Sequence, residues 1–458
     1  MNIKRKTFHS TAILVSGYMV SQIIRFGGSL ITTRLLAPEL FGIMAVVTSI
    51  ATLVALFSDV GLNLSVIRSK RGDDLNFLRT VFSFKVLQTS ALATIIITLA
   101  LIFYWLNSHN LLAEGSVYAT SELSIALSIV AIAVFMQGFR SIQIELAARN
   151  QNVGRQTAIE ISAQTCSLLF IVLLSRENPS IYALAFAQVV SAFVTVAGSY
   201  LLFPRKTFGF AWDKSAIKEI ISFGKWILGS TAIVGISNNL DKLLFGFLLT
   251  STQMGVYSIA ALIFNAMDTV FKRINAALFP AISRVIREGK SDLSKVYYKI
   301  RLYRDLAVCI PAGLVLINGD ILISILYDDR YLDAGFYLQL LTIAQLIECF
   351  FYKNQLLISL GETRLQFDLA IRRLVALIIF VPAGYYFFGV TGILLALSAR
   401  RLIGGWLIFI RYREHCEIKI QYELRTVAII LTSIAFWFIA RMALLHVFPA
   451  LDPQVPVL

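Results

Sequence analysis

The residues that decide the fold are TAILVSGYMVSQIIRFGGSL, a long and mostly apolar stretch at Thr11–Leu30. At a helical rise of about 1.5 Å per residue, a stretch of this length crosses a bilayer core of about 30 Å. Similar stretches follow it, among them Phe41–Phe57, Phe82–Leu106 and Leu123–Phe139. The sequence therefore predicts an all-α polytopic membrane protein.

The composition agrees with this class. Hydrophobic residues make up 57% of the chain and charged residues 15%, far from the soluble average. The net charge of +14 lies mostly in connections that we expect to face anionic lipid, so it does not call for nucleic acid. The histidines and cysteines have no metal-ligand spacing, and no phosphate-binding loop occurs. We expect no metal, no cofactor and no enzymatic activity.

Lys and Arg alternate between the connections. The N-terminus and every second connection are basic, as in Arg68–Arg79 and Arg284–Arg301, whereas the intervening connections hold little beyond Arg34, Arg176 and Arg330. By the positive-inside rule the basic set is cytoplasmic. The pattern predicts about 13 spans, with the N-terminus inside and the C-terminus outside.

A weak internal repeat divides the chain. Leu35–Gly42 joins spans one and two, and Leu248–Gly255 joins spans seven and eight; each has a Leu pair followed six residues later by Gly. Six is an even number of spans, so the repeat is parallel. It predicts two six-helix bundles plus about one extra C-terminal helix. The expected parts are a first lobe at 1–203, a cytoplasmic linker at 204–221, a second lobe at 222–411, and an extra helix with its tail at 412–458.

Cations within the spans are the first candidate site residues, because an intramembrane charge needs a partner or a cavity. Arg25, Lys85, Lys272 and Arg273 are predicted to bind a phosphate-bearing amphiphile, which Arg can hold with two hydrogen bonds. For cations near the inner surface, Lys85 among them, snorkelling to lipid headgroups remains the alternative.

Acids within the spans are candidates for coupling to a proton or a sodium ion. They are Asp59, Asp241, Asp268 and Glu348. Two alternatives stay open. Asp59 and Lys85 have similar depths and could form a structural ion pair, and Asp268 precedes Lys272 by four residues and could pair with it locally.

Five patches resemble one transporter family. They are Arg34–Gly42, Asp59–Leu62, Asn239–Lys242, Met254–Ser258 and Leu278–Ser283. In order and spacing the chain resembles the polysaccharide-exporting flippases of the multidrug/oligosaccharidyl-lipid/polysaccharide exporter superfamily. The resemblance implies two bundles around a cavity with alternating access. Members commonly have 14 spans, so the C-terminal topology departs from the family pattern.

The resemblance also implies a function. We expect an ion-coupled flippase of the bacterial cytoplasmic (inner) membrane that moves undecaprenyl-diphosphate-linked oligosaccharide to the outer leaflet for exopolysaccharide or O-antigen (lipopolysaccharide) synthesis. Its partners would be the lipid-linked oligosaccharide, membrane lipids and a glycan polymerase. The alternatives are a cation-coupled multidrug exporter of the same superfamily and a non-transporting scaffold of a glycan-synthesis complex. The excess of intramembrane cations argues against cationic drugs.

The topology is tested by single-cysteine labelling with a membrane-impermeant thiol reagent on intact cells, in a variant without its four native cysteines. Ser291→Cys, in a basic connection, should be unreactive from outside, and Ala113→Cys, in a connection poor in Lys and Arg, should react. Outside labelling of Ser291→Cys would contradict the assigned orientation.

Overall fold

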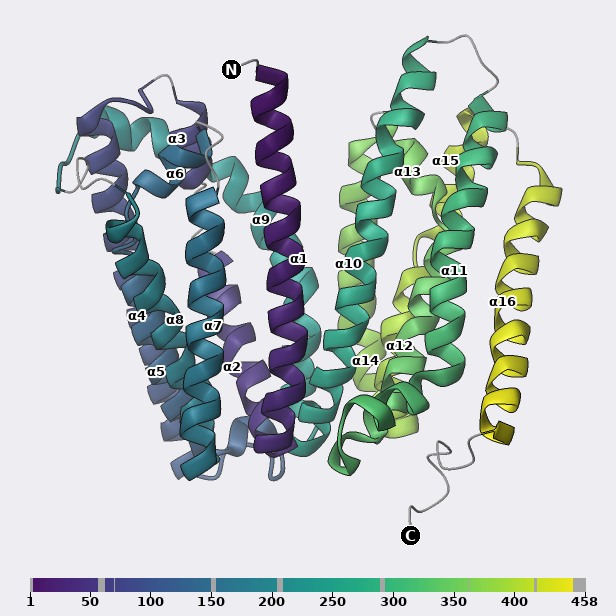
Figure 1. Cartoon of the computed structure of the whole chain (residues 1–458), viewed down its shortest axis with the longest axis horizontal. Coiled ribbons are helices and arrows are strands. Elements are labelled where there is room, and N and C mark those ends of the chain that lie inside the picture. The colour runs from purple at the N-terminus through teal and green to yellow at the C-terminus, as the bar shows by residue number, and fades with distance from the viewer. Residues whose placement is uncertain are drawn as a thin grey trace. The chain divides into compact units, whose positions relative to one another are not determined.

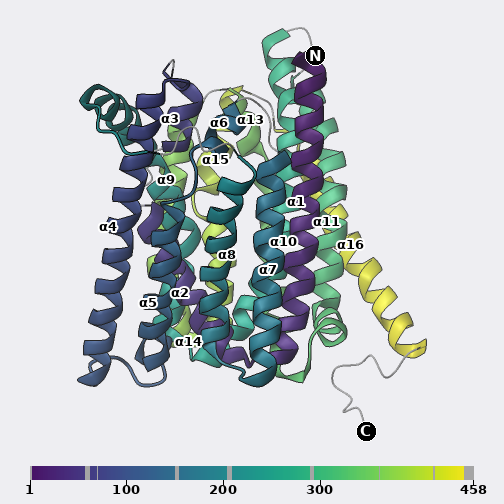
Figure 2. The same ribbon diagram turned by 60° about the vertical axis from the view of Figure 1, so that its left-hand side comes forward.

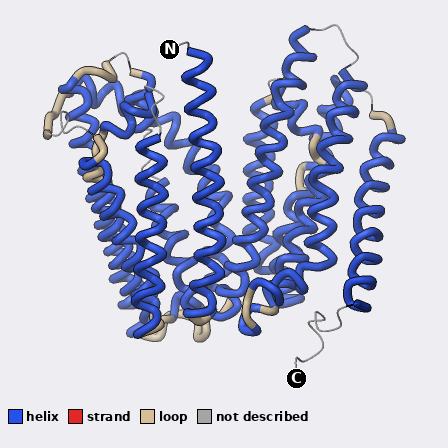
Figure 3. Tube along the Cα trace, in the orientation of Figure 1, coloured by secondary structure: helices blue, strands red, loops and turns tan. Residues whose placement is uncertain are grey.

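The structure is a computed structural model that describes residues 3–56, 62–69, 71–149, 154–203, 209–288, 293–360, 362–415 and 418–447. Every regular element in these ranges is a helix (Figure 3). Eight of the described helices are long and apolar enough to cross a membrane. The protein is thus an all-α, multi-pass membrane protein, as predicted, while the finer count of about 13 spans stays a prediction.

The chain divides into two compact units, Met1–Gly255 and Val256–Leu458. In the first unit α4 packs on α5, α5 on α8, α8 on α7, α7 on α1, and α2 on α9 (Figure 1 and Figure 2). The elements that begin in this unit are α1 (Ile3–Leu35), α2 (Pro38–Leu56), α3 (Leu62–Arg68), α4 (Leu75–Ser108), the 3-10 helix η1 (Val117–Ala119), α5 (Ser121–Gln137), α6 (Gln143–Arg149), α7 (Gly154–Glu177), α8 (Ile181–Leu201), α9 (Lys214–Leu248) and α10 (Ser251–Glu288).

In the second unit α11 packs against α12 and α16, and α12 packs against α14. Its further elements are α11 (Leu293–Leu326), η3 (Asp329–Tyr331), α12 (Asp333–Phe350), α13 (Lys353–Ser359), α14 (Thr363–Ala399), η4 (Arg400–Leu402), α15 (Gly405–His415) and α16 (Ile420–Val447). The chain reverses inside α14 at Gly389, whose φ of +58° favours glycine. Gly384 and Gly392 then lie backbone to backbone, with no room for a side chain at either.

The order of elements recurs along the chain. The series η1, α5, α6 begins at Val117, Ser121 and Gln143, and the series η3, α12, α13 begins at Asp329, Asp333 and Lys353. The helices that precede the two series, α4 and α11, both have 34 residues. The two series are offset by 210 to 212 residues, close to the spacing of the two Leu-Leu…Gly motifs.

Polar contacts fix the segment that leads into α9. Asp213 caps α9 by accepting a hydrogen bond from the Ser215 N–H, and it binds Arg71 at 2.6 Å. Arg71 also reaches Asp74, the N-cap of α4, at 3.1 Å. The Arg71 guanidinium holds the pKa of Asp213 below its usual range. The helix begins at Lys214, so the last part of the predicted linker 204–221 belongs to α9. The predicted lobe boundaries otherwise stay a prediction.

The two repeated motifs pack against each other within the first unit. A side chain at Gly42 would overlap the carbonyl oxygen of Ser251, and one at Gly255 would overlap that of Pro38. Thr252 Oγ1 donates a hydrogen bond of 2.8 Å to Glu39 Oε1 beside this crossing. The glycines of the motif are therefore needed where the first turns of α2 and α10 cross.

Gly42→Ala should lower the free energy of unfolding by about 1–3 kcal/mol, because the added methyl overpacks a backbone contact. Gly27→Ala is the matched control: nothing lies within 4 Å of a Cβ at Gly27. It should be neutral or stabilise by up to about 1 kcal/mol. Thermal unfolding of the purified variants in detergent measures both, and equal stability of the two would refute the crossing.

Candidate functional site

Arg25 on α1 lies at a polar cavity of the first unit. The cavity has a volume of about 370 Å³ and is formed by α1, α7 and α8. The Arg25 side chain is exposed, and it makes no hydrogen bond or ion pair with any residue that the structure describes. The lining residues are Ile24, Arg25, Gly28, Ser29, Thr32, Gln164, Ser167, Leu168, Ile171, Gln188 and Ser191.

The three walls of this cavity follow from helical spacing. Gln164 and Ser167 lie three residues apart on α7, and Gln188 and Ser191 three apart on α8, so each pair shares one face. Gly28 lets Leu168 of α7 approach α1 to van der Waals distance. Polar groups in the middle of apolar helices are costly unless they face water or a ligand. The arrangement can hold a hydrated anionic headgroup.

Lys85 lies at a second cavity, of about 400 Å³, lined by α2, α4 and the end of α5. Its Nζ donates to Glu145 Oε1 and to the Arg140 carbonyl oxygen, both at 3.3 Å. Arg140 Nη2 binds the same Glu145 oxygen at 2.5 Å. Burial raises the pKa of Glu145, but Lys85 and Arg140 outweigh it and leave that pKa below its ordinary value. Lys85 is thus an ion-paired residue in this conformation.

The sequence analysis missed Glu145 and Arg140. Both lie in a connection interpreted as a basic cytoplasmic loop, whereas the structure forms the short helix α6 there. The available signal was a single acid, Glu145, between two arginines of that connection, Arg140 and Arg149.

Three of the other predicted site residues, Lys272, Asp268 and Glu348, form ion pairs. Lys272 Nζ binds Asp268 Oδ2 at 2.7 Å, which is the ion pair between residues four apart that the sequence left open as an alternative. The Lys272 side chain is nevertheless 72% exposed. Glu348 Oε2 binds Arg401 Nη1 at 3.1 Å. The remaining predicted residues are Arg273, exposed on α10, Asp241, half-buried on α9, and Asp59, which lies outside the described residues together with its suggested pairing to Lys85.

A buried ionic network joins α16 to α11 and α13 in the second unit. Glu423 Oε1 of α16 accepts a hydrogen bond from Arg301 Nη1 at 2.8 Å and forms an ion pair with Lys353 Nζ at 2.7 Å. Thr426 Oγ1 donates to Asp305 Oδ2 at 2.7 Å. The Arg301 and Lys353 side chains are fully buried. The sequence predicts Arg301 in a cytoplasmic connection, and nothing in the sequence indicates that the extra helix supplies the counter-ion of this network.

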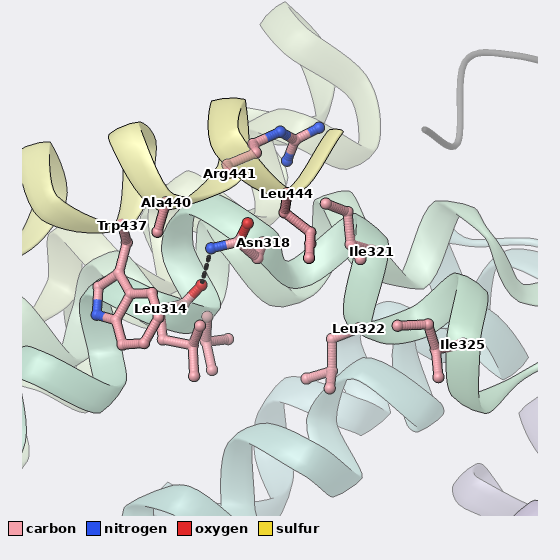
Figure 4. Close-up of a pocket in the computed structure, with 10 residues that line it drawn as sticks. Leu314, Asn318, Ile321, Leu322, Ile325, Trp437, Ala440, Arg441 and Leu444 are labelled. Carbon is pink, nitrogen blue, oxygen red and sulfur yellow. Dashed lines mark hydrogen bonds between the residues drawn. The ribbon is translucent and has the colours of Figure 1, made fainter. Parts of the chain in front are cut away.

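An apolar groove of about 280 Å³ lies farther along the same pair of helices (Figure 4). Leu314 and Ile325 of α11 and Trp437 of α16 are among its lining residues. Arg441 at the groove binds Asp320 at 2.7 Å through each of its two terminal nitrogens. The Arg441 charge is therefore balanced, and the groove presents hydrocarbon.

No group of three or more His, Cys, Asp or Glu residues in the described parts of the chain could hold a metal ion. The polar chemistry of the structure is therefore that of ion pairs, amides and hydroxyls, with Arg25 as the exposed cation of the polar cavity.

Comparison with known proteins decides the family. The family described as Polysaccharide biosynthesis protein matches residues 31–360. The chain belongs to this family. A curated relative, Lsg locus putative protein 1 of Haemophilus influenzae, is 22% identical over 224 residues, which are 47% of this chain and 55% of the relative. The chain thus spans about half the length of the curated relative it matches.

Solved structures identify the fold of this polysaccharide biosynthesis protein. The lipid II flippase MurJ, in an inward closed conformation, matches with a TM-score of 0.69 and 12% identity over 95% of this chain and 93% of that one. A multidrug resistance MATE family transporter of the MOP superfamily, in an inward-facing conformation, matches with a TM-score of 0.64 and 16% identity over 89% and 95%. The chain therefore shares the fold of these two transporters, and the family match over residues 31–360 confirms the family resemblance.

Removing Glu145 should destabilise the protein by about 3–5 kcal/mol, because Glu145→Ala leaves two cations without their shared counter-ion. Glu160→Ala, at an exposed residue of α7 that binds only Gln156 among the described contacts, should change stability by less than about 0.5 kcal/mol. Unfolding curves of the two variants make the comparison. A Glu145→Ala protein as stable as Glu160→Ala would contradict the paired assignment of Lys85.

Proposed function

We propose that this protein is an ion-coupled alternating-access flippase for undecaprenyl-diphosphate-linked oligosaccharide. It would lie in a bacterial cytoplasmic membrane with its N-terminus inside, and deliver glycan to the outer leaflet for exopolysaccharide or O-antigen synthesis. The observation that carries the proposal is Arg25, an exposed cation in a polar cavity that α1, α7 and α8 form in a polysaccharide biosynthesis protein.

Alternating access is supported by the internal repetition. The recurring element order fits two six-helix bundles in parallel orientation, and the paired Leu-Leu…Gly motifs mark corresponding turns. The extra helix α16 is bound to α11 through the Arg301–Glu423 pair and the Arg441–Asp320 pair. We therefore assign α16 to the second bundle as a fixed element.

Substrate binding rests first on Arg25. A guanidinium can donate two parallel hydrogen bonds to a diphosphate. Arg273 and Lys272 are exposed cations of α10 that would contact the diphosphate at another stage of the cycle. Lys85 would join them only after Glu145 releases it.

Ion coupling would use acids that hold cations in this conformation. Protonation of Asp268 would release Lys272, and protonation of Glu348 would release Arg401. Asp241 and Asp59 remain candidates for the same role from the first unit. A proton or a sodium ion is the expected coupling ion, and no other cofactor is proposed.

The alternative function, multidrug export, is favoured only by the similarity to a MATE transporter. That similarity is one of fold and does not indicate the substrate. The lining of the Arg25 cavity contains no acid and no aromatic residue among the described side chains, whereas cationic drugs call for one or the other. A scaffold for a glycan polymerase would need no exposed intramembrane cation.

Arg25→Ala should abolish display of lipid-linked glycan on the outer leaflet at normal membrane levels of the protein. Arg25→Lys should restore it only in part, because an ammonium cannot reproduce the two-pronged guanidinium contact. Arg155→Ala is a matched control, since this exposed arginine of α7 binds only the Leu202 carbonyl oxygen among its described hydrogen bonds. Surface labelling of the glycan in cells gives the readout. Full display by Arg25→Ala would favour the scaffold.

A further inference from the structure

The polar lining of the Arg25 cavity exceeds what a diphosphate needs. Besides Arg25, two amide side chains and two serines line the cavity from α7 and α8: Gln164, Gln188, Ser167 and Ser191. These groups are neutral, and each can donate and accept hydrogen bonds. A phosphate offers acceptors only, whereas a sugar offers hydroxyls that both donate and accept.

The two amides are available to a ligand. Ser21 Oγ donates a 2.8 Å hydrogen bond to Gln164 Oε1, which fixes the amide and leaves its Nε2 donors for another partner. Gln188 is exposed and makes no hydrogen bond to any residue within the described ranges. An amide in the middle of an apolar span is stable only against water or a polar ligand.

We infer that Gln164 and Gln188 select the sugar that carries the diphosphate. This inference rests on the proposed function, since it takes Arg25 to hold the phosphates. A sugar joined directly to the diphosphate must lie next to Arg25, and the amides of α7 and α8 line the same cavity. Selectivity would then come from hydrogen bonds that a sugar with the wrong hydroxyl or acetamido pattern leaves unmade.

The test measures the binding of three lipids to the purified full-length protein in nanodiscs. They are undecaprenyl diphosphate, undecaprenyl-diphosphate-N-acetylglucosamine and undecaprenyl-diphosphate-galactose. At least one sugar-bearing lipid should bind about tenfold more tightly than the bare diphosphate, as expected for one or two added hydrogen bonds. Gln164→Leu and Gln188→Leu should each weaken that lipid about fivefold and leave the bare diphosphate unchanged.

Two controls separate this inference from the proposed function. Gln156→Leu, at a half-buried residue of α7 that binds Glu160 and does not line the cavity, should bind every lipid as the wild type does. Arg25→Ala should weaken all three lipids alike. If Arg25→Ala behaves so but the amide variants affect the bare diphosphate equally, or affect no lipid, the sugar-selecting role is overturned and the flippase proposal stands. If the wild type binds none of the three lipids, both are overturned.

Discussion

The constraint on which this structure depends is the cost of placing charge in a bilayer, about 2.5–3.5 kcal/mol per residue at the centre of a span. The chain meets this cost, and the related cost of burying a charge in protein, mainly by pairing. Lys85 and Arg140 share Glu145 in the first unit, and Arg301 and Lys353 share Glu423 in the second. Each pair of cations lies at a short helix, α6 in the first unit and α13 in the second, and these two helices hold the same place in the recurring order of elements. An ionic contact at this short helix is therefore a feature that the two units share.

Arg25 departs from this rule. Its charge faces a polar cavity instead of a carboxylate, so an anion or water must balance it during the working cycle. A cation that the protein leaves exposed within the membrane can be satisfied by a substrate, while a paired cation must first be released. We therefore rank the predicted substrate-binding residues by how readily a substrate can reach their charge, with Arg25 first and Lys85 last.

The sequence alone was enough to predict the class of the protein, because apolar spans are a local property of the chain, and five short patches were enough to predict its family. It also located the Leu-Leu…Gly motifs, whose glycines meet at the crossing of α2 and α10. It could not find the partners of the charges, because Lys85 and Glu145 are 60 residues apart, and Arg301 and Glu423 are 122 apart. Only local pairs such as Asp268 and Lys272 follow from helical spacing.

The central claim is that Arg25 faces an aqueous cavity that binds a diphosphate. Ser167→Cys, at the lining of the same cavity in a protein that keeps Arg25 and lacks its native cysteines, should react with a small hydrophilic thiol reagent. Undecaprenyl diphosphate should slow that reaction, whereas undecaprenol should not. A cysteine at this position that stays unreactive, or that reacts at the same rate with and without undecaprenyl diphosphate, would contradict the account.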